Sequence, residues 1–197
     1  MKSGVLNKFW DHLPVTSSTP KFSLGEGDTP LVKSRKLSEI VGCEDIYFKL
    51  EGCNPTGSFK DRGMVLAIAK AIEDGGTRIA CASTGNTSAS AAAYGAYCGL
   101  PTTVFVPKGY VAQGKLAQAI AYGARIMLIK GNFDDALKSY KNAIEKNPNY
   151  SFVTARLLLD SLRTEALSFL NIAPSATPDE MSKLYPLCFQ QGIHKGI

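Results

Sequence analysis

The residues of this chain best suited to chemistry lie together in Asn54-Pro55-Thr56-Gly57-Ser58-Phe59-Lys60-Asp61-Arg62. Lys60 directly follows a Gly-Ser-Phe turn and directly precedes an apolar run with helical spacing. A lysine held at such a junction, away from bulk water, can lose its proton and form a Schiff base with a carbonyl compound. The alternative is an ordinary solvated lysine, because most lysines are exposed. The fixed turn before Lys60 favours the first interpretation.

A second polar stretch, Ser83-Thr84-Gly85-Asn86-Thr87-Ser88-Ala89-Ser90, leads into three alanines. Ser, Thr and Asn are favoured helix caps, so this segment predicts the start of a helix built from small residues. Hydroxyl groups and backbone amides at a helix start can also bind an anion. Asn86 can donate a hydrogen bond to the phenolic oxygen of a pyridine ring. Together with Lys60, this stretch makes pyridoxal-phosphate (PLP) chemistry our leading interpretation.

The elements that must position these two stretches alternate between strands and helices. The pattern predicts strands at Ile46–Leu50, Ile79–Ala82, Thr102–Val106, Arg125–Ile129 and Tyr150–Val153, and helices at about 61–74, 86–98, 113–122 and 133–146. This order predicts an α/β fold with a parallel sheet covered on both faces by helices. Ligands of such folds gather at the carboxyl ends of strands, where we expect both polar stretches.

Composition excludes several classes of function. The net charge of +5 over 197 residues is modest and its basic residues are scattered, so nucleic acid is not an expected partner. Neither a membrane-spanning run nor a signal peptide is recognisable, so no membrane partner is expected. The cysteines show no close pair, which favours reduced thiols in the cytoplasm, and two histidines are too few for a multi-histidine metal centre. These residues are Cys43, Cys53, Cys81, Cys98, Cys188, His12 and His194.

Three segments, Gly25–Leu31, Leu50–Arg62 and Ala82–Ala89, closely resemble the threonine synthases. These belong to the fold-type II (tryptophan-synthase-β-like) PLP-dependent enzymes, and the resemblance covers roughly residues 20–154. It implies a lyase of threonine biosynthesis that converts O-phospho-L-homoserine and water into L-threonine and phosphate. A related serine/threonine dehydratase or β-replacement enzyme, and a non-catalytic remnant that keeps the scaffold, are the alternatives.

The same resemblance implies a role for each matching residue. Lys60 would hold PLP covalently and then move protons at Cα and Cβ of the substrate. Phe59 would pack near the ring, Asn86 would hydrogen-bond the ring oxygen, and Gly192 could serve the loop that holds the cofactor phosphate. The carboxylate or phosphate of the substrate would be received by Ser83, Thr84, Thr87, Ser88 and Arg163. Lys115 is better interpreted as lying on a solvated helix face.

After about Thr154 the sequence departs from the family pattern. We expect residues 1–53 to belong to the large domain, residues 54–154 to form the small βαβ domain with the PLP lysine, and residues 155–197 to be a divergent remnant of an incomplete large domain. A chain truncated in this way would lose several charge-assisted hydrogen bonds to the cofactor phosphate, each worth roughly 1.5–3 kcal/mol. It would also expose apolar surface that a homodimer could cover.

Overall fold

The computed structural model describes residues 3–108 and 113–131, together with residues 135, 138, 139, 142, 145 and 146. The chain divides into two compact units, Met1–Ala155 and Arg156–Ile197, and all described residues belong to the first. The helices and strands are, in chain order, α1 (Val5–Lys8), η1 (Trp10–His12), β1 (Leu31–Lys33), α2 (Leu37–Val41), β2 (Tyr47–Lys49), η2 (Glu51–Cys53), α3 (Lys60–Glu73), β3 (Ile79–Ala82), α4 (Asn86–Tyr97), β4 (Thr102–Pro107), α5 (Gln113–Ala121) and β5 (Arg125–Ile129).

The strands β3, β4 and β5 form a parallel sheet in that order. Cys81 of β3 lies opposite Val104 of β4, and Phe105 of β4 lies opposite Met127 of β5. The helices α4 and α5 make the two crossovers that parallel neighbours require. These βαβ units confirm the predicted α/β class, with a parallel sheet flanked by helices.

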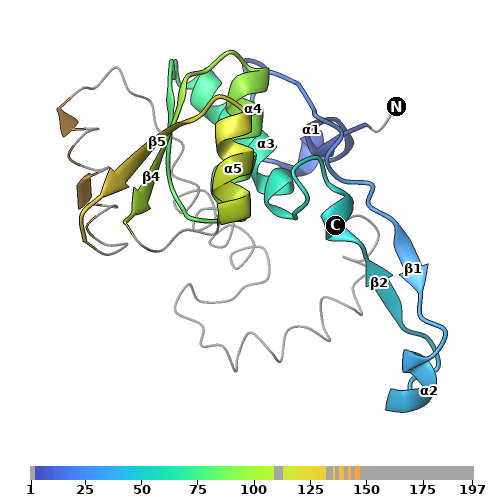
Figure 1. Ribbon diagram of the computed structural model, residues 1–197. Helices are drawn as coiled ribbons and strands as arrows, with labels where there is room; N and C mark the ends of the chain where they lie inside the picture. Colours follow the sequence, from blue (N-terminus) through green and yellow to red (C-terminus); the bar gives the residue numbers. More distant parts are fainter. Residues whose placement is uncertain are drawn as a thin grey trace, which may run out of the picture. The chain divides into compact units, whose positions relative to one another are not determined.

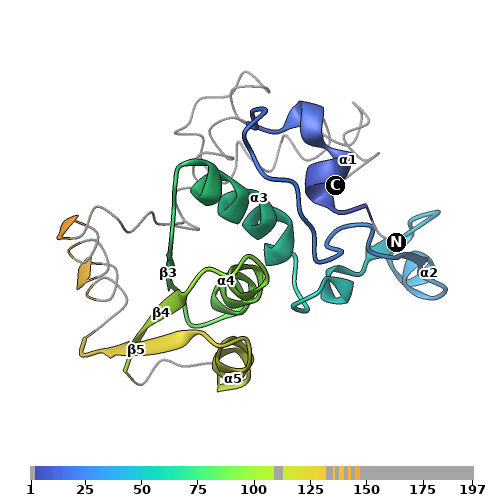
Figure 2. The same ribbon diagram turned by 90° about the horizontal axis from the view of Figure 1, so that it is seen from above.

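The helices α3, α4 and α5 lie side by side on one face of this sheet, with α4 in the middle (Figures 1 and 2). The middle place requires small side chains, and α4 supplies them in Ala89, Ala91, Ala92, Ala93 and Gly95, all buried. A Cβ on Gly95 would collide with the Thr102 hydroxyl and with Cδ1 of Ile79. The polar stretch that begins α4 therefore leads into a helix that packs against neighbours on three sides.

The predicted elements of this region agree closely with the observed ones. The predicted helices at 61–74, 86–98 and 113–122 correspond to α3, α4 and α5, and three predicted strands correspond to β3, β4 and β5. Gly75 and Gly123 follow their helices with φ of 79° and 80°, a conformation that favours glycine. Residues 135, 138, 139, 142 and 145 are helical, within the helix predicted at 133–146. The strand predicted at Tyr150–Val153 lies outside the described residues.

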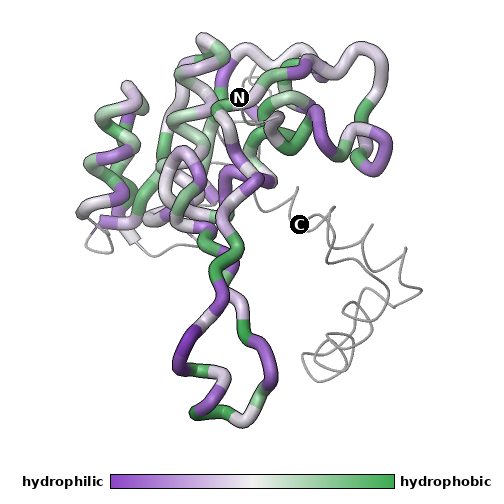
Figure 3. The backbone as a smooth tube through the Cα atoms, turned by 90° about the vertical axis from the view of Figure 1, so that its right-hand side faces the viewer, coloured by the Kyte–Doolittle hydropathy of each residue, from purple (hydrophilic) through white to green (hydrophobic). Residues whose placement is uncertain are grey.

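One prediction about the sheet is wrong. The segment Ile46–Leu50 does contain a strand, β2, but β2 pairs antiparallel with β1 in a separate two-stranded ribbon, with Val32 opposite Phe48. The Lys60 loop therefore does not follow a strand of the parallel sheet. Hydrophobic and hydrophilic residues are mixed along this ribbon (Figure 3), and every residue of both strands is exposed. A strand of three residues carries too little pattern to reveal its partner.

The expected division between residues 1–53 and 54–154 stays a prediction, as does the origin of residues 155–197, which lie outside the described part. Within residues 3–108 and 113–131, no helix is long and apolar enough to cross a membrane. The described cysteines Cys43, Cys53, Cys81 and Cys98 are free thiols.

Candidate active site

Lys60 is the first residue of α3. Its backbone N–H donates to the Ser58 hydroxyl at 3.3 Å, and Gly57 takes a φ of 78° that favours glycine in the turn before it. The amine of Lys60 lies 4.6 Å from the centre of the Phe59 ring. Lys60 is partly buried as a residue, and in the part of the chain that the structure describes its amine makes no hydrogen bond or ion pair. It is therefore chemically available to a ligand.

The start of α4 is built by its own serines. The Ser88 hydroxyl donates to the Gly85 carbonyl at 2.6 Å, and the Ser83 hydroxyl accepts from the Gly85 N–H at 3.2 Å. Ser88 is 1% exposed, and its hydroxyl is already engaged with the Gly85 carbonyl. The side chains of Thr84, Asn86 and Thr87 are partly buried and make no hydrogen bonds within the described residues. Their polar groups are thus unengaged within that part of the chain.

A buried carboxylate joins the start of α3 to α4. Asp61, which follows Lys60 and has no exposed surface, accepts hydrogen bonds from the Thr56 N–H at 2.7 Å and the Thr56 hydroxyl at 2.6 Å. It also accepts from the hydroxyl of Ser90 on α4 at 2.6 Å. Because Ser90 lies one helical turn beyond Asn86, this contact brings the Lys60 loop and the Asn86 loop to neighbouring helix ends.

The helix α5 reaches the same loop. Lys115 and Gln118 donate to the Thr56 carbonyl at 3.3 Å and 3.1 Å, and Lys115 also donates to the Gln118 side chain at 3.3 Å. The prediction of a solvated Lys115 is therefore wrong, because its amine is partly buried against the 54–58 loop. The spacing of residues along α5 could not reveal which loop packs against it.

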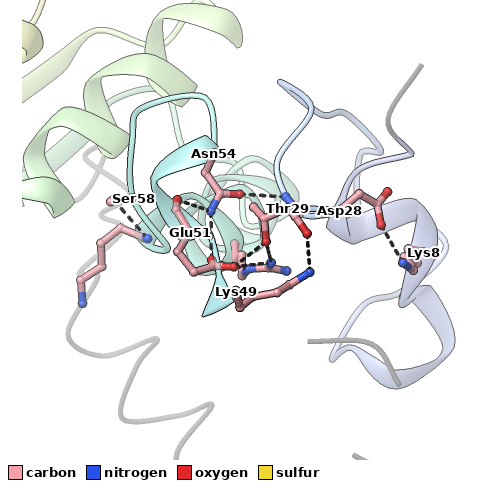
Figure 4. A network of polar contacts seen from close by, with 10 residues as sticks. Lys8, Asp28, Thr29, Lys49, Glu51, Asn54 and Ser58 are labelled. Carbon is pink, nitrogen blue, oxygen red and sulfur yellow. Dashed lines mark hydrogen bonds and ion pairs between the residues drawn. The ribbon is translucent and has the colours of Figure 1, made fainter. Parts of the chain in front are cut away.

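An ion pair supports the segment before the Lys60 loop (Figure 4). Arg62 donates to the two carboxylate oxygens of Glu51, each at 2.7 Å, and to the Thr29 hydroxyl at 3.1 Å. The hydrogen bonds that Arg62 donates to Glu51 lower the pKa of Glu51 to about 2 and raise the pKa of Arg62. Asn54 donates to Glu51 and accepts from the Gly27 N–H at 2.9 Å. This network anchors the chain just ahead of the turn that presents Lys60.

Sequence reasoning missed Thr56, Asp61, Ser90 and Glu51 as parts of the site. The available signal was the acidic residue next to Lys60, since a carboxylate in the first turn of a buried helix needs donors nearby. Of the residues that were predicted, Lys60, Phe59, Ser83, Thr84, Asn86, Thr87 and Ser88 lie on these two neighbouring helix starts. Arg163 and Gly192 lie outside the described residues, so their roles stay predictions.

The described residues fit the carbonyl carbon, the ring face and the phenolic oxygen of PLP. The cofactor needs an amine for its carbonyl carbon, an apolar contact for its ring and a donor for its phenolic oxygen. Lys60 supplies the amine, Phe59 lies beside it with 52% of its surface exposed, and Asn86 has an unengaged carboxamide. The described ranges contain no cluster of three or more metal-ligating side chains. A separate hollow of about 520 Å³ near Ser23 and Cys53 includes none of these residues.

The sequence matches the family described as Pyridoxal-phosphate dependent enzyme over residues 22–165, and the chain belongs to this family. Among curated relatives, it is 55% identical over 148 residues to threonine synthase of Bacillus sp. (strain ULM1), which covers 75% of this chain and 42% of the relative. It is 57% identical over 145 residues to threonine synthase of Halalkalibacterium halodurans, covering 74% and 41%. It is 44% identical over 178 residues to threonine synthase of Mycobacterium tuberculosis, covering 89% and 49%.

The chain therefore spans less than half the length of these curated relatives. Among solved structures, O-acetyl serine sulfhydrylase isoform 3 from Entamoeba histolytica matches with a TM-score of 0.60 and 26% identity, over 80% of this chain and 53% of that one. A pyridoxal 5'-phosphate-dependent aspartate racemase matches with a TM-score of 0.58 and 26% identity, over 71% and 45%. These matches confirm the predicted fold-type II class and the resemblance from which it came.

Proposed function

We propose that this protein carries out threonine-synthase chemistry, converting O-phospho-L-homoserine and water into L-threonine and phosphate, with PLP held at Lys60. The observation that supports this most directly is Lys60, the first residue of α3, whose amine lies over the Phe59 ring and makes no polar contact in the described part. The identity of 44–57% to proteins named threonine synthase supports the choice of substrate.

In this proposal Lys60 has two tasks. Its amine holds the cofactor, and it later moves a proton at Cα and then at Cβ of the substrate. Bound PLP supplies an electron sink for the negative charge that develops beside the cofactor. Phe59 excludes water from one side of the ring, and Asn86 donates a hydrogen bond to the ring oxygen.

The substrate anion is received at the start of α4 in this proposal. Backbone N–H groups at a helix start favour a carboxylate or phosphate. Of the four predicted hydroxyls, those of Thr84 and Thr87 are unengaged, whereas Ser83 and Ser88 hold the Gly85 backbone. Thr84 and Thr87 are therefore the better direct contacts. Arg163 as a phosphate ligand and Gly192 as part of the cofactor-phosphate loop belong to the same proposal.

The proposal also includes a cytoplasmic location, which free thiols favour. It extends to a homodimer, since the β1–β2 ribbon exposes apolar side chains such as Leu31 and Phe48. Sedimentation of the purified chain would test whether it forms a homodimer.

The first experiment is a PLP titration of the purified chain, followed by borohydride reduction and peptide mapping. We expect saturable labelling of one lysine, Lys60, in the wild type. The Lys60→Arg variant should lose this label, and the variant Lys108→Arg, which changes an exposed lysine, should keep it. Scattered labelling of surface lysines, or none, would overturn the proposal and favour a non-catalytic remnant.

The second experiment measures phosphate released from O-phospho-L-homoserine by wild type loaded with PLP and not treated with borohydride. Release of phosphate with formation of threonine supports the proposal. Formation of a keto acid from serine or threonine, without phosphate release, would instead identify a dehydratase.

A further inference from the structure

Asp61 occupies an unusual place beside the proposed catalytic lysine. It is fully buried, although aspartate is seldom buried without compensation, and it directly follows Lys60. Three donors surround it: the N–H and the hydroxyl of Thr56, and the hydroxyl of Ser90. An ionised carboxylate accepts hydrogen bonds only, and this set of donors matches that property. The side chain therefore has a fixed position determined from two elements.

Thr56 is held from a third element as well. Its carbonyl accepts from Lys115 and Gln118 of α5, while its N–H and hydroxyl reach Asp61 of α3. Through Ser90, the same network continues to α4. The first turn of α3 is thus connected to α5 through Thr56, four positions before Lys60, and to the second turn of α4 through Asp61.

We propose that Asp61 is a positioning residue, which fixes the Lys60 loop relative to the start of α4. The amine of Lys60 and the carboxamide of Asn86 must face the same cofactor, yet they belong to different helices. The Asp61–Ser90 hydrogen bond joins those two helices, and Asp61 is the neighbour of Lys60 while Ser90 lies one turn beyond Asn86. This inference rests on the proposed function, because it assigns the network to a lysine that binds PLP.

A general contribution to stability is the competing explanation, and Glu26 provides the matched control. Glu26 is also fully buried, and it accepts hydrogen bonds from Val5, Ser23, Leu24 and the hydroxyl of Tyr94. Tyr94 lies one turn beyond Ser90 on α4, so the two carboxylates hold the same helix at successive turns. Only the Asp61 network involves the Lys60 loop.

The test compares Asp61→Asn, Ser90→Ala and Thr56→Val with Glu26→Gln and wild type. The first readout is the pH profile of trace acetylation of Lys60 by acetic anhydride, relative to the exposed Lys108, which requires no cofactor. The second is the rate at which PLP attaches to Lys60, measured by borohydride trapping. A urea unfolding curve for each variant shows that it is folded.

We expect Ser90→Ala and Thr56→Val to shift the acetylation profile of Lys60 and to slow PLP attachment about tenfold or more, because small misplacements of reacting groups have large effects on rate. Thr56→Ser, which keeps the hydroxyl, should restore both values. Both readouts of Asp61→Asn should lie between those of wild type and those of Ser90→Ala and Thr56→Val. The amide of the new side chain can donate to the two hydroxyls while its oxygen accepts from the Thr56 N–H. Glu26→Gln should lose stability with both Lys60 readouts unchanged.

Two results would overturn the inference: Lys60 readouts in folded Ser90→Ala and Thr56→Val that equal those of wild type, or the same changes in Glu26→Gln. A third result would separate the proposed PLP-dependent function from the positioning role of Asp61. If wild type attaches no PLP while the acetylation profile still depends on Ser90 and Thr56, the proposed function fails and the positioning role of Asp61 holds.

Discussion

Two regions of similar apolar content behave in opposite ways. The parallel strands β3 and β4 bury nearly every side chain, and Val104 and Val106 of β4 pack against α4 and α5. The ribbon of β1 and β2 leaves Leu31, Val32, Tyr47 and Phe48 between 45% and 62% exposed. A two-stranded ribbon without a covering layer is marginal in water. The difference shows that an apolar strand is buried only where another layer is available to cover it.

The Glu51–Arg62 pair lies where the two regions meet. Thr29 precedes β1, Glu51 follows β2, and Arg62 belongs to the first turn of α3. The ribbon is thus anchored at its base by polar contacts, whereas the helical layer is held by apolar packing. Four substitutions test this contrast.

The largest effect is expected inside the helical layer. Ile68 on α3 is fully buried, so Ile68→Ala should lower the free energy of unfolding by about 2–5 kcal/mol through lost contacts and a residual cavity. The matched control is Ile40→Ala in α2, where the side chain is 77% exposed. Urea unfolding should show little change for the control. Equal losses of unfolding free energy for Ile68→Ala and Ile40→Ala would mean that another surface covers α2 in solution.

Glu51→Gln should give the next largest effect, at the junction of the two regions. Because the folded-state pKa of Glu51 is depressed to about 2, its contribution is present above its ordinary pKa of 4.5 and is lost as pH falls toward 2. We expect a loss of roughly 1–2 kcal/mol at pH 7, discounted because the pair is partly exposed.

The pH dependence provides the check on that assignment. Stability of Glu51→Gln measured between about pH 5 and pH 2 should fall less steeply than that of wild type. Parallel curves for the two proteins would show that the ion pair contributes no proton-linked stability.

Tyr94→Phe tests a single buried hydrogen bond of the packed region. The hydroxyl of Tyr94 donates to Glu26 at 2.8 Å, and burial, followed by the nearby negative charge of Glu26, raises the pKa of Tyr94. Its removal should lower the free energy of unfolding by about 1 kcal/mol, because Glu26 keeps its other donors. Tyr47→Phe in the exposed ribbon serves as the control and should be neutral. A neutral Tyr94→Phe would contradict the hydrogen bond.

The smallest effect is expected on the ribbon itself. Val32 lies opposite Phe48 and is 45% exposed, so Val32→Thr should change the free energy of unfolding by no more than about 0.5 kcal/mol. A loss above about 1 kcal/mol would indicate that a second copy or another segment buries this surface. Sedimentation of the same variant would then decide between these two.

Prediction from sequence succeeded where spacing carries the information. The helices α3, α4 and α5 were found within one or two residues, because apolar periodicity and terminal glycines mark their ends. Lys60 and Asn86 were recognised as candidates because motif residues stand at helix starts. The partner of β2 was assigned wrongly, since three residues do not encode whether their neighbour is parallel or antiparallel.

In the candidate site, too, local spacing did not reveal which side chains contact one another. Nothing in the sequence links Thr56 to Lys115, 59 residues later, or Asp61 to Ser90, 29 residues later. Lys115 was therefore interpreted as solvated, although it lies against the loop of the candidate lysine. Hydrogen bonds between distant residues become visible only when the helices have been packed.

The amino-acid sequence was sufficient to establish the α/β class, the PLP-dependent family and the two polar stretches at helix starts, because these depend on local periodicity and on motifs within a few residues. Tertiary structure alone decided that α4 lies between α3 and α5, that Asp61 joins two helix starts, and that the β1–β2 ribbon stays exposed. Such features arise from contacts between segments far apart in the chain, whose energies depend on shape and burial rather than on local sequence.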